Sequence, residues 1–184
     1  MKKYVGLSVA LLCFSLVAVG GNQTVKKSPV AINRGVVTGS QCDGVDGNLV
    51  LNCGFETGTF ASWTQSGDLS FTGVDSLSAH SGTFGAFLGP INDQGMLTQI
   101  LPTTAGGTYT LTLWLRNDFG TPNNFYIVWD GTVIDGFVDS GPFDYMQLEY
   151  DGLVASADGT ELTFSFFQVP AYYYLDDIAV VPGS

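Results

Sequence analysis

The sequence predicts an all-β domain, a β-sandwich of the jelly-roll type. Its composition suits strands joined by tight turns, because only 12% of the 184 residues are charged while 13% are aromatic and 24 are glycines. Short apolar or alternating runs follow one another and are separated by Gly, Pro, Asp and Asn, which is typical of successive strands. Beyond residue 20, no long stretch shows the 3.6-residue period of an amphipathic helix.

The strands are expected along one domain, because a chain of 184 residues is long enough for a single full core. Turn signals separate them, for example Asp130-Gly131 and Asp158-Gly159. With no helices in between, a sandwich is favoured over an α/β fold. The expected strands are Leu69–Val74, Phe84–Leu88, Met96–Leu101, Tyr109–Arg116, Phe125–Trp129, Thr132–Phe137, Tyr145–Leu153, Glu161–Phe167 and Tyr173–Val181.

Residues 1–20 have the features of a bacterial export signal. Lys2 and Lys3 give a positive start, Tyr4–Val19 is apolar, and Ala18-Val19-Gly20 offers the small residues that a signal peptidase prefers. We expect cleavage and a protein that is secreted or lies at the cell surface, without membrane contact after cleavage. A retained anchor is the alternative, although the apolar run is shorter than the about 20 residues that span a bilayer. Residues 21–47 are polar and aperiodic, which predicts a flexible arm or linker before a domain at 48–184.

The charge balance narrows the classes of partner. Removal of Lys2 and Lys3 with the signal leaves four basic residues against 17 acidic ones. Such a surface repels nucleic acid and anionic lipid, and it suits neutral ligands and divalent cations. The simpler alternative is that acidity only keeps an exported protein soluble.

Two cysteines remain after the signal, Cys42 and Cys53. An even pair in an exported protein favours a disulfide. It would join the segment before residue 48 to the start of the domain, although the sequence does not give the Cα separation that a bond requires.

Alternation separates the two faces of the expected strands. Leu111, Leu113 and Leu115 share one face and are expected in the core. An aromatic ring on the opposite, polar face offers a platform for the apolar side of a sugar, and polar neighbours bind its hydroxyls. The alternative is that a loop or the arm covers this face. The outward aromatic residues and their polar neighbours are Trp114 with Arg116, Tyr145 with Gln147, and Phe167 with Gln168.

Both ends of the expected domain carry motifs of a known family. Asn48 to Trp63 reads Asn-Leu-Val-Leu-Asn-Cys-Gly-Phe-Glu-Thr-Gly-Thr-Phe-Ala-Ser-Trp, with a short strand expected at its start, and Tyr172 to Val180 contains Tyr-Leu-Asp-Asp-Ile-Ala-Val. In this order they resemble carbohydrate-binding modules of families 4/9 and 22. The resemblance implies a galactose-binding-like jelly roll that binds a glycan and is not an enzyme. It also places Phe55 and Trp63 in the core.

The resemblance further implies a structural Ca²⁺ between the first and last strands. Its ligands would be oxygen atoms, as calcium requires. Alternation along a strand lets only one of the two aspartates face the ion well, and we favour Asp176. The alternative is a set of solvated or hydrogen-bonded carboxylates. The expected site comprises Glu56, Asp176, Asp177, Gly54 and Ser81.

Catalysis has little support in the sequence. His80 is the only histidine, and there is no Gly-x-Ser-x-Gly motif around a nucleophile. With 17 acidic residues, some pair of carboxylates is inevitable and indicates nothing. The rival to a glycan-binding module is therefore a structural or adhesive surface protein that associates with itself or docks onto another protein.

Overall fold

The structure is a computed structural model that describes residues 39–183. The predicted export signal and most of the predicted arm lie outside the described residues. Within them, no helix is long and apolar enough to cross a membrane. The elements are η1 (Gln41–Gly44), β1 (Thr64–Gly67), β2 (Thr72–Asp75), β3 (Gly85–Leu88), β4 (Gly95–Leu101), β5 (Thr108–Asn117), β6 (Asn123–Trp129), β7 (Thr132–Val138), β8 (Phe143–Val154), β9 (Thr160–Gln168) and β10 (Tyr173–Pro182).

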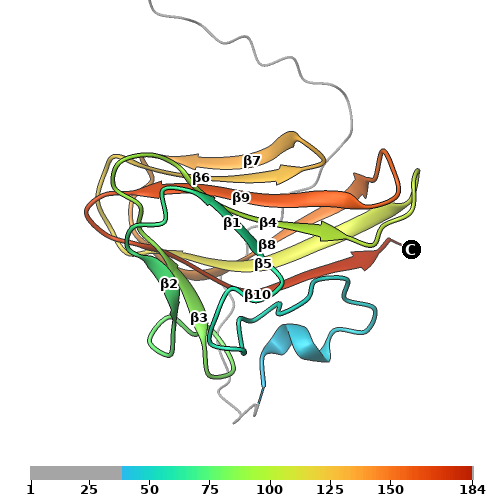
Figure 1. Cartoon of the computed structure of the whole chain (residues 1–184), viewed down its shortest axis with the longest axis horizontal. Helices are drawn as coiled ribbons and strands as arrows, with labels where there is room; N and C mark the ends of the chain where they lie inside the picture. The colour runs from blue at the N-terminus through green and yellow to red at the C-terminus, as the bar shows by residue number, and fades with distance from the viewer. Residues whose placement is uncertain (1–38, 184) are drawn as a thin grey trace, which may run out of the picture.

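The strands form two antiparallel sheets packed face to face (Figure 1). Sheet A has the order β2-β3-β10-β5-β8, and sheet B has the order β1-β4-β9-β6-β7. Most neighbours in the sheets come from distant parts of the sequence, as β10 between β3 and β5 shows, while β2–β3 and β6–β7 are consecutive. This arrangement confirms the predicted sandwich.

The core lies between the sheets and is filled by the inward residues of each strand. The predicted inward residues of β5 and β9 are fully buried, including Leu111, Leu113, Phe164 and Phe166. Trp63 also joins the core and contacts Phe164, with ring centroids 5.8 Å apart. Alternation therefore predicted the buried faces correctly, as expected for sheets with one face packed and one solvated.

Two segments differ from the prediction. The strand expected at the start of 48–63 is wrong: this segment is a series of turns, and it lies beside β10 through a bond from Leu49 N–H to the carbonyl of Val180 (2.9 Å). Strand β1 was not predicted, because Thr64–Gly67 is exposed throughout and has no apolar residue. It joins sheet B by pairing with β4.

Replacement of Phe164 by Ala is expected to lower the free energy of unfolding by about 3–5 kcal/mol, because it leaves a cavity where two aromatic neighbours meet. Phe164 is 0% exposed and packs against the rings of Trp63 and Phe125. The control, Ile100→Ala at a 61% exposed position of β4, should cost less than about 1 kcal/mol. Urea unfolding measures both. Equal losses would contradict this assignment of the core.

Candidate functional site

The outer face of sheet A carries two neighbouring rows of side chains that differ in exposure. In the first row, Phe87 of β3 lies opposite Tyr174 of β10, and Tyr174 lies opposite Arg116 of β5. All three side chains are partly exposed. We call Phe87, Tyr174 and Arg116 the open row. Since directly paired residues project to the same side of a sheet, these side chains form one continuous strip across three strands.

The second row lies two residues away from the open row on β10 and β5, and its members on these two strands are buried. Here Asp176 of β10 lies opposite Trp114 of β5, which lies opposite Gln147 of β8. The loop between β2 and β3 closes over it, because His80 stacks on Trp114 with ring centroids 3.8 Å apart. Trp114 is only 6% exposed. The alternative in which a loop covers the predicted platform therefore holds at Trp114.

Tyr145 is held under the same loop. Its hydroxyl donates to the carbonyl of Ser78 over 2.6 Å, and its ring lies 5.1 Å from that of His80. Burial, together with the charge of Asp176, raises the pKa of Tyr145 well above its usual value. The phenol therefore stays protonated and acts as a hydrogen-bond donor to the loop.

The predicted single aromatic face is wrong for the third pair of residues. Phe167 and Gln168 belong to β9, which lies in sheet B rather than in sheet A. Gln168 is fully buried and donates from Nε2 to Oδ1 of Asn117 (2.5 Å). Alternation distinguishes inward from outward residues, but it does not show which sheet a strand joins.

Arg116 is fixed by a partner two residues away. Its Nε donates to Oδ1 of Asp118 over 3.1 Å, and Nη2 donates to the same oxygen. The hydroxyl of Tyr174 donates to the other oxygen, Oδ2, over 2.6 Å. The guanidinium also lies over the Tyr174 ring, 4.4 Å from its centroid, an arrangement that favours a cation. The three side chains thus hold one another in place without a ligand.

A shallow, open hollow of about 500 Å³ adjoins Arg116. It combines an apolar wall with polar groups at the ends of β5 and β8. Such a mixture suits a ligand with both apolar and hydroxyl surfaces. The lining residues are Arg116, Asn117, Asp118, Pro142, Phe143 and Asp144.

The aromatic strip extends beyond the open row through Tyr172. Its ring contacts Phe87 edge-on at 5.7 Å and lies 6.1 Å from that of Tyr174. The predicted site did not include Phe87, Tyr172, Tyr174 or Asp118. Alternation in the run Tyr172-Tyr173-Tyr174 could have identified the two outer residues, because Tyr173 is fully buried and its two neighbours project to the opposite face.

Beneath the covering loop, the buried carboxylates of Asp176 and Asp177 form a carboxylate cluster with His80. Oδ2 of Asp176 accepts from the backbone N–H groups of His80 (2.8 Å) and Ser81 (3.2 Å). Oδ2 of Asp177 lies 2.6 Å from Nδ1 of His80, and the Asp177 carboxylate accepts hydrogen bonds from the hydroxyls of Ser81 and Ser40. Three segments distant in sequence therefore meet at two carboxylates.

The expectation that only one aspartate faces this site is wrong. The pairing of β10 with β5 shifts register after Asp176, and Asp177 has a positive φ of 48°. Such a bulge adds a residue and redirects its side chain. Both carboxylates consequently lie on the same side, with Asp176 0% and Asp177 4% exposed.

Burial and the neighbouring charge of Asp177 raise the pKa of Asp176 to about 9. Burial also acts to raise the pKa of Asp177, but hydrogen bonds from His80, Ser40 and Ser81 outweigh it and hold that pKa below its usual value. The cluster thus contains one ionised carboxylate and a second whose ionisation lacks a compensating charge. A bound cation would supply that charge.

The donor set fits the predicted calcium in its chemistry. Ligand atoms of His80, Asp176 and Asp177 lie within 4.8 Å of one another, and the oxygens of Asp176, Asp177 and Ser81 are of the type that calcium prefers. Gly54 belongs to this region, since a Cβ on it would lie 3.4 Å from Oδ1 of Asp176. Glu56 lies outside the cluster, where its carboxylate accepts from the N–H groups of Thr83 (2.9 and 3.0 Å) and Phe84 (3.1 Å).

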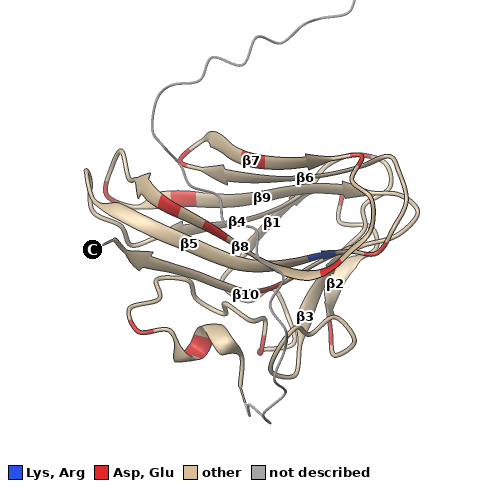
Figure 2. Cartoon of the chain, turned by 180° about the vertical axis from the view of Figure 1, so that it is seen from behind, with Lys and Arg blue, Asp and Glu red and all other residues tan. Residues whose placement is uncertain are grey.

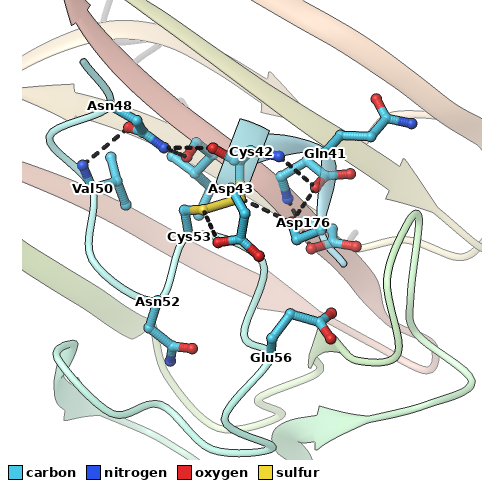
Figure 3. The surroundings of a disulfide bond; sticks show 12 residues. Gln41, Cys42, Asp43, Asn48, Val50, Asn52, Cys53, Glu56 and Asp176 are labelled. Carbon is cyan, nitrogen blue, oxygen red and sulfur yellow. Dashed lines mark hydrogen bonds between the residues drawn. A yellow bond between two sulfur atoms is a disulfide. The ribbon is translucent and has the colours of Figure 1, made fainter. Parts of the chain in front are cut away.

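The predicted disulfide is present and joins η1 to the turn at Cys53 (Figure 3). Cys42 is 3% exposed, and its backbone N–H donates a hydrogen bond to Oδ1 of Asp177 over 3.3 Å. Residues 39–47, predicted as the end of the arm, therefore include two buried residues, Ser40 and Cys42, that donate hydrogen bonds to the carboxylate cluster.

Comparison with known proteins identifies the fold. No protein-family model and no curated protein matches the chain. The chain is similar to the solved structure of TmCBM61 in complex with β-1,4-galactotriose, with a TM-score of 0.60 and 19% identity over 74% of this chain and 99% of that one. It is also similar to a xylan-binding domain from CBM 22 (TM-score 0.54, 19% identity, covering 75% and 97%). The chain has the jelly-roll fold of carbohydrate-binding modules.

A third similar structure is described as an adhesin domain and not as a carbohydrate-binding module. The K1 cleaved adhesin domain of Lys-gingipain from Porphyromonas gingivalis W83 matches with a TM-score of 0.55 and 14% identity, over 71% of this chain and 96% of that one. At these identities the comparisons establish the fold, and the ligand has to be argued from this chain's own residues.

Replacement of both Cys42 and Cys53 by Ser is expected to lower the free energy of unfolding by about 2–3 kcal/mol, because the bond closes a short loop in the unfolded chain. Urea unfolding measures the change. As a control, a reducing agent should bring the unmodified protein to the same midpoint and leave the double variant unchanged. A double variant as stable as the oxidised protein would show that η1 is held without the bond.

Proposed function

We propose that this chain is an exported, non-catalytic module that binds a glycan on the outer face of sheet A. The observation that carries the proposal is the partly exposed Tyr174 ring beside the fixed Arg116–Asp118 pair at the edge of the hollow. A sugar has an apolar face of C–H groups and a rim of hydroxyls. Tyr174 and Phe87 would contact the face, and the remaining N–H groups of Arg116 would donate to the rim.

The similar structures support this proposal at the level of fold. TmCBM61 is described with a bound galactotriose, and the CBM 22 domain is described as xylan-binding. The position of the site differs from our sequence-based expectation, since Trp114 is covered and Tyr174 is accessible. We assign the platform role to Tyr174 and Phe87, while Trp114, Tyr145 and Gln147 support the covering loop or lie next to it.

The proposal of a non-catalytic role rests on the position of His80. It is the only histidine of the chain, and its side chain is 1% exposed. Its Nδ1 points at Asp177 and its ring stacks on Trp114. A general base has to reach a substrate proton, and a buried histidine in these contacts is a structural residue.

An adhesive role is the second candidate, and the similarity to an adhesin domain favours it. Two aromatic side chains in loops support it further, because Phe71 is 58% and Phe119 is 59% exposed. A second copy of the chain would bury them. Assembly that grows with protein concentration and ignores added glycans, measured by analytical ultracentrifugation, would support this candidate over the first.

We also propose that the carboxylate cluster binds a structural Ca²⁺. Asp176, Asp177 and Ser81 would hold it, and the ion would neutralise two carboxylates that are buried side by side. The role would be structural, since the cluster ties together the covering loop, β10 and η1.

Replacement of Tyr174 by Ala is expected to abolish the retardation of the protein in affinity gels that contain a polysaccharide bound by the unmodified protein. The ring supplies both the platform and a contact that orients Arg116. Loss of a stacked aromatic contact corresponds to roughly tenfold or more in affinity. Phe167→Ala is the matched control, since Phe167 lies on sheet B and should leave retardation unchanged. Loss of retardation in Phe167→Ala but not in Tyr174→Ala would place the site on sheet B.

Calcium at about 100 times its dissociation constant is expected to stabilise the protein by about 2.7 kcal/mol. For a domain of this size the melting temperature should then rise by on the order of 5–10 °C. Magnesium at the same concentration is the control, because it accommodates this many protein ligands poorly. If neither calcium nor a chelator moves the melting temperature, the hydrogen bonds of His80, Ser40 and Ser81 alone hold the carboxylates.

A further inference from the structure

Positive charge is nearly absent from the described part of the chain. Arg116 is the only lysine or arginine among residues 39–183, and the same residues include all 17 acidic side chains. Figure 2 shows this single basic position on β5, with acidic positions distributed over both sheets and the loops. It is also the basic residue that borders the hollow.

The one cation is already neutralised before a ligand arrives. Both bonds from Arg116 to Asp118 end on the same carboxylate oxygen. The second oxygen of Asp118 is held by the Tyr174 hydroxyl at 2.6 Å. A carboxylate in this position is fixed by three donors, so it cannot swing away to release the guanidinium without breaking all of them.

The remaining charge around the hollow is negative. Asp144 lines it and is exposed, and Asp139 is exposed in the connection between β7 and β8 that leads to it. An anionic ligand would therefore meet the carboxylates of Asp144 and Asp139, while the guanidinium of Arg116 is already paired with Asp118. Neutral hydroxyls, in contrast, would find N–H groups of Arg116 and carboxylate oxygens as partners.

We infer that Asp118 is a selectivity residue, which neutralises Arg116 so that the site accepts neutral glycans and rejects carboxylated or sulfated ones. This inference rests on the proposed function. A free arginine binds a carboxylate or sulfate through paired hydrogen bonds. Asp118 occupies the paired donors on Nε and Nη2 and neutralises the charge of the guanidinium, and like charges placed together in a binding site repel one another.

The test compares one polysaccharide with its own charged form. The neutral polymer that retards the full chain most in affinity gels is carboxymethylated to a low degree, and both forms are cast into gels at equal concentration. The unmodified protein should bind the charged form at least about tenfold more weakly. Equal retardation by both forms would overturn the inference and leave glycan binding intact. Retardation by no polymer would instead remove the proposed function.

The Asp118→Asn variant tests the residue itself, because it keeps the shape and removes the charge. It should gain retardation by the carboxymethylated polymer, and about 0.5–1 M salt should abolish that gain, since exposed charges are then screened. Asp46→Asn removes the same charge at an exposed position and should gain nothing. An equal gain in both variants would assign the effect to net charge and overturn the role of Asp118.

Folding of the variants is checked by melting curves. Asp144→Asn provides a second variant that leaves the Arg116–Asp118–Tyr174 contacts intact, since its Oδ1 accepts only from the N–H of Tyr145 among the hydrogen bonds of the described chain. It should also bind the charged polymer more strongly than the unmodified protein does, with a smaller gain than Asp118→Asn. No gain in either folded variant would contradict the inference.

Discussion

The pairing of β10 with β3 and β5 determines both parts of the candidate site. Tyr174 and Asp176 lie two residues apart and project from the same face, where Tyr174 lies opposite Phe87 and Arg116, and Asp176 lies opposite Trp114. The intervening Leu175 is fully buried, and a shift of one residue would expose it and bury Tyr174. Such a slip is costly when one face of a strand packs in a core. The core therefore fixes the register, and the register places an accessible ring beside a buried carboxylate.

Burial of the carboxylates explains why the accessible platform is at Tyr174 and not at Trp114. A buried carboxylate needs donors to offset the loss of hydration. The loop between β2 and β3 provides them through the N–H groups of His80 and Ser81. The same loop places the His80 ring on Trp114. Closing the loop over Asp176 thus necessarily covers the tryptophan, and the exposed aromatic surface is left at the next row of the sheet.

The sequence predicted what depends on local periodicity and missed what depends on how distant segments meet. Inward residues such as Leu113 and Phe164 follow from alternation within one strand, and so did the fold class. The position of Phe167 in sheet B depends on strand order, which alternation does not determine. The shared side of Asp176 and Asp177 depends on a bulge, and the cover over Trp114 depends on a loop whose residues show no apolar pattern. Alternation also puts Tyr174 on the outward face of its strand, but a functional role was predicted only for the nearby Asp176 and Asp177.

The contacts among Arg116, Asp118 and Tyr174 bear on how such a site binds. Each side chain is held by the other two through hydrogen bonds or a ring contact, so little side-chain freedom remains to be lost when a ligand arrives. Immobilising a long side chain such as arginine otherwise costs on the order of 0.5–1.5 kcal/mol on binding. A shallow hollow offers limited contact area, and a prearranged set of donors and acceptors is a physical means by which it can still bind a hydroxyl-rich ligand. The pairing that neutralises Arg116 is therefore also the pairing that orients it, which links the selectivity of the site to its rigidity.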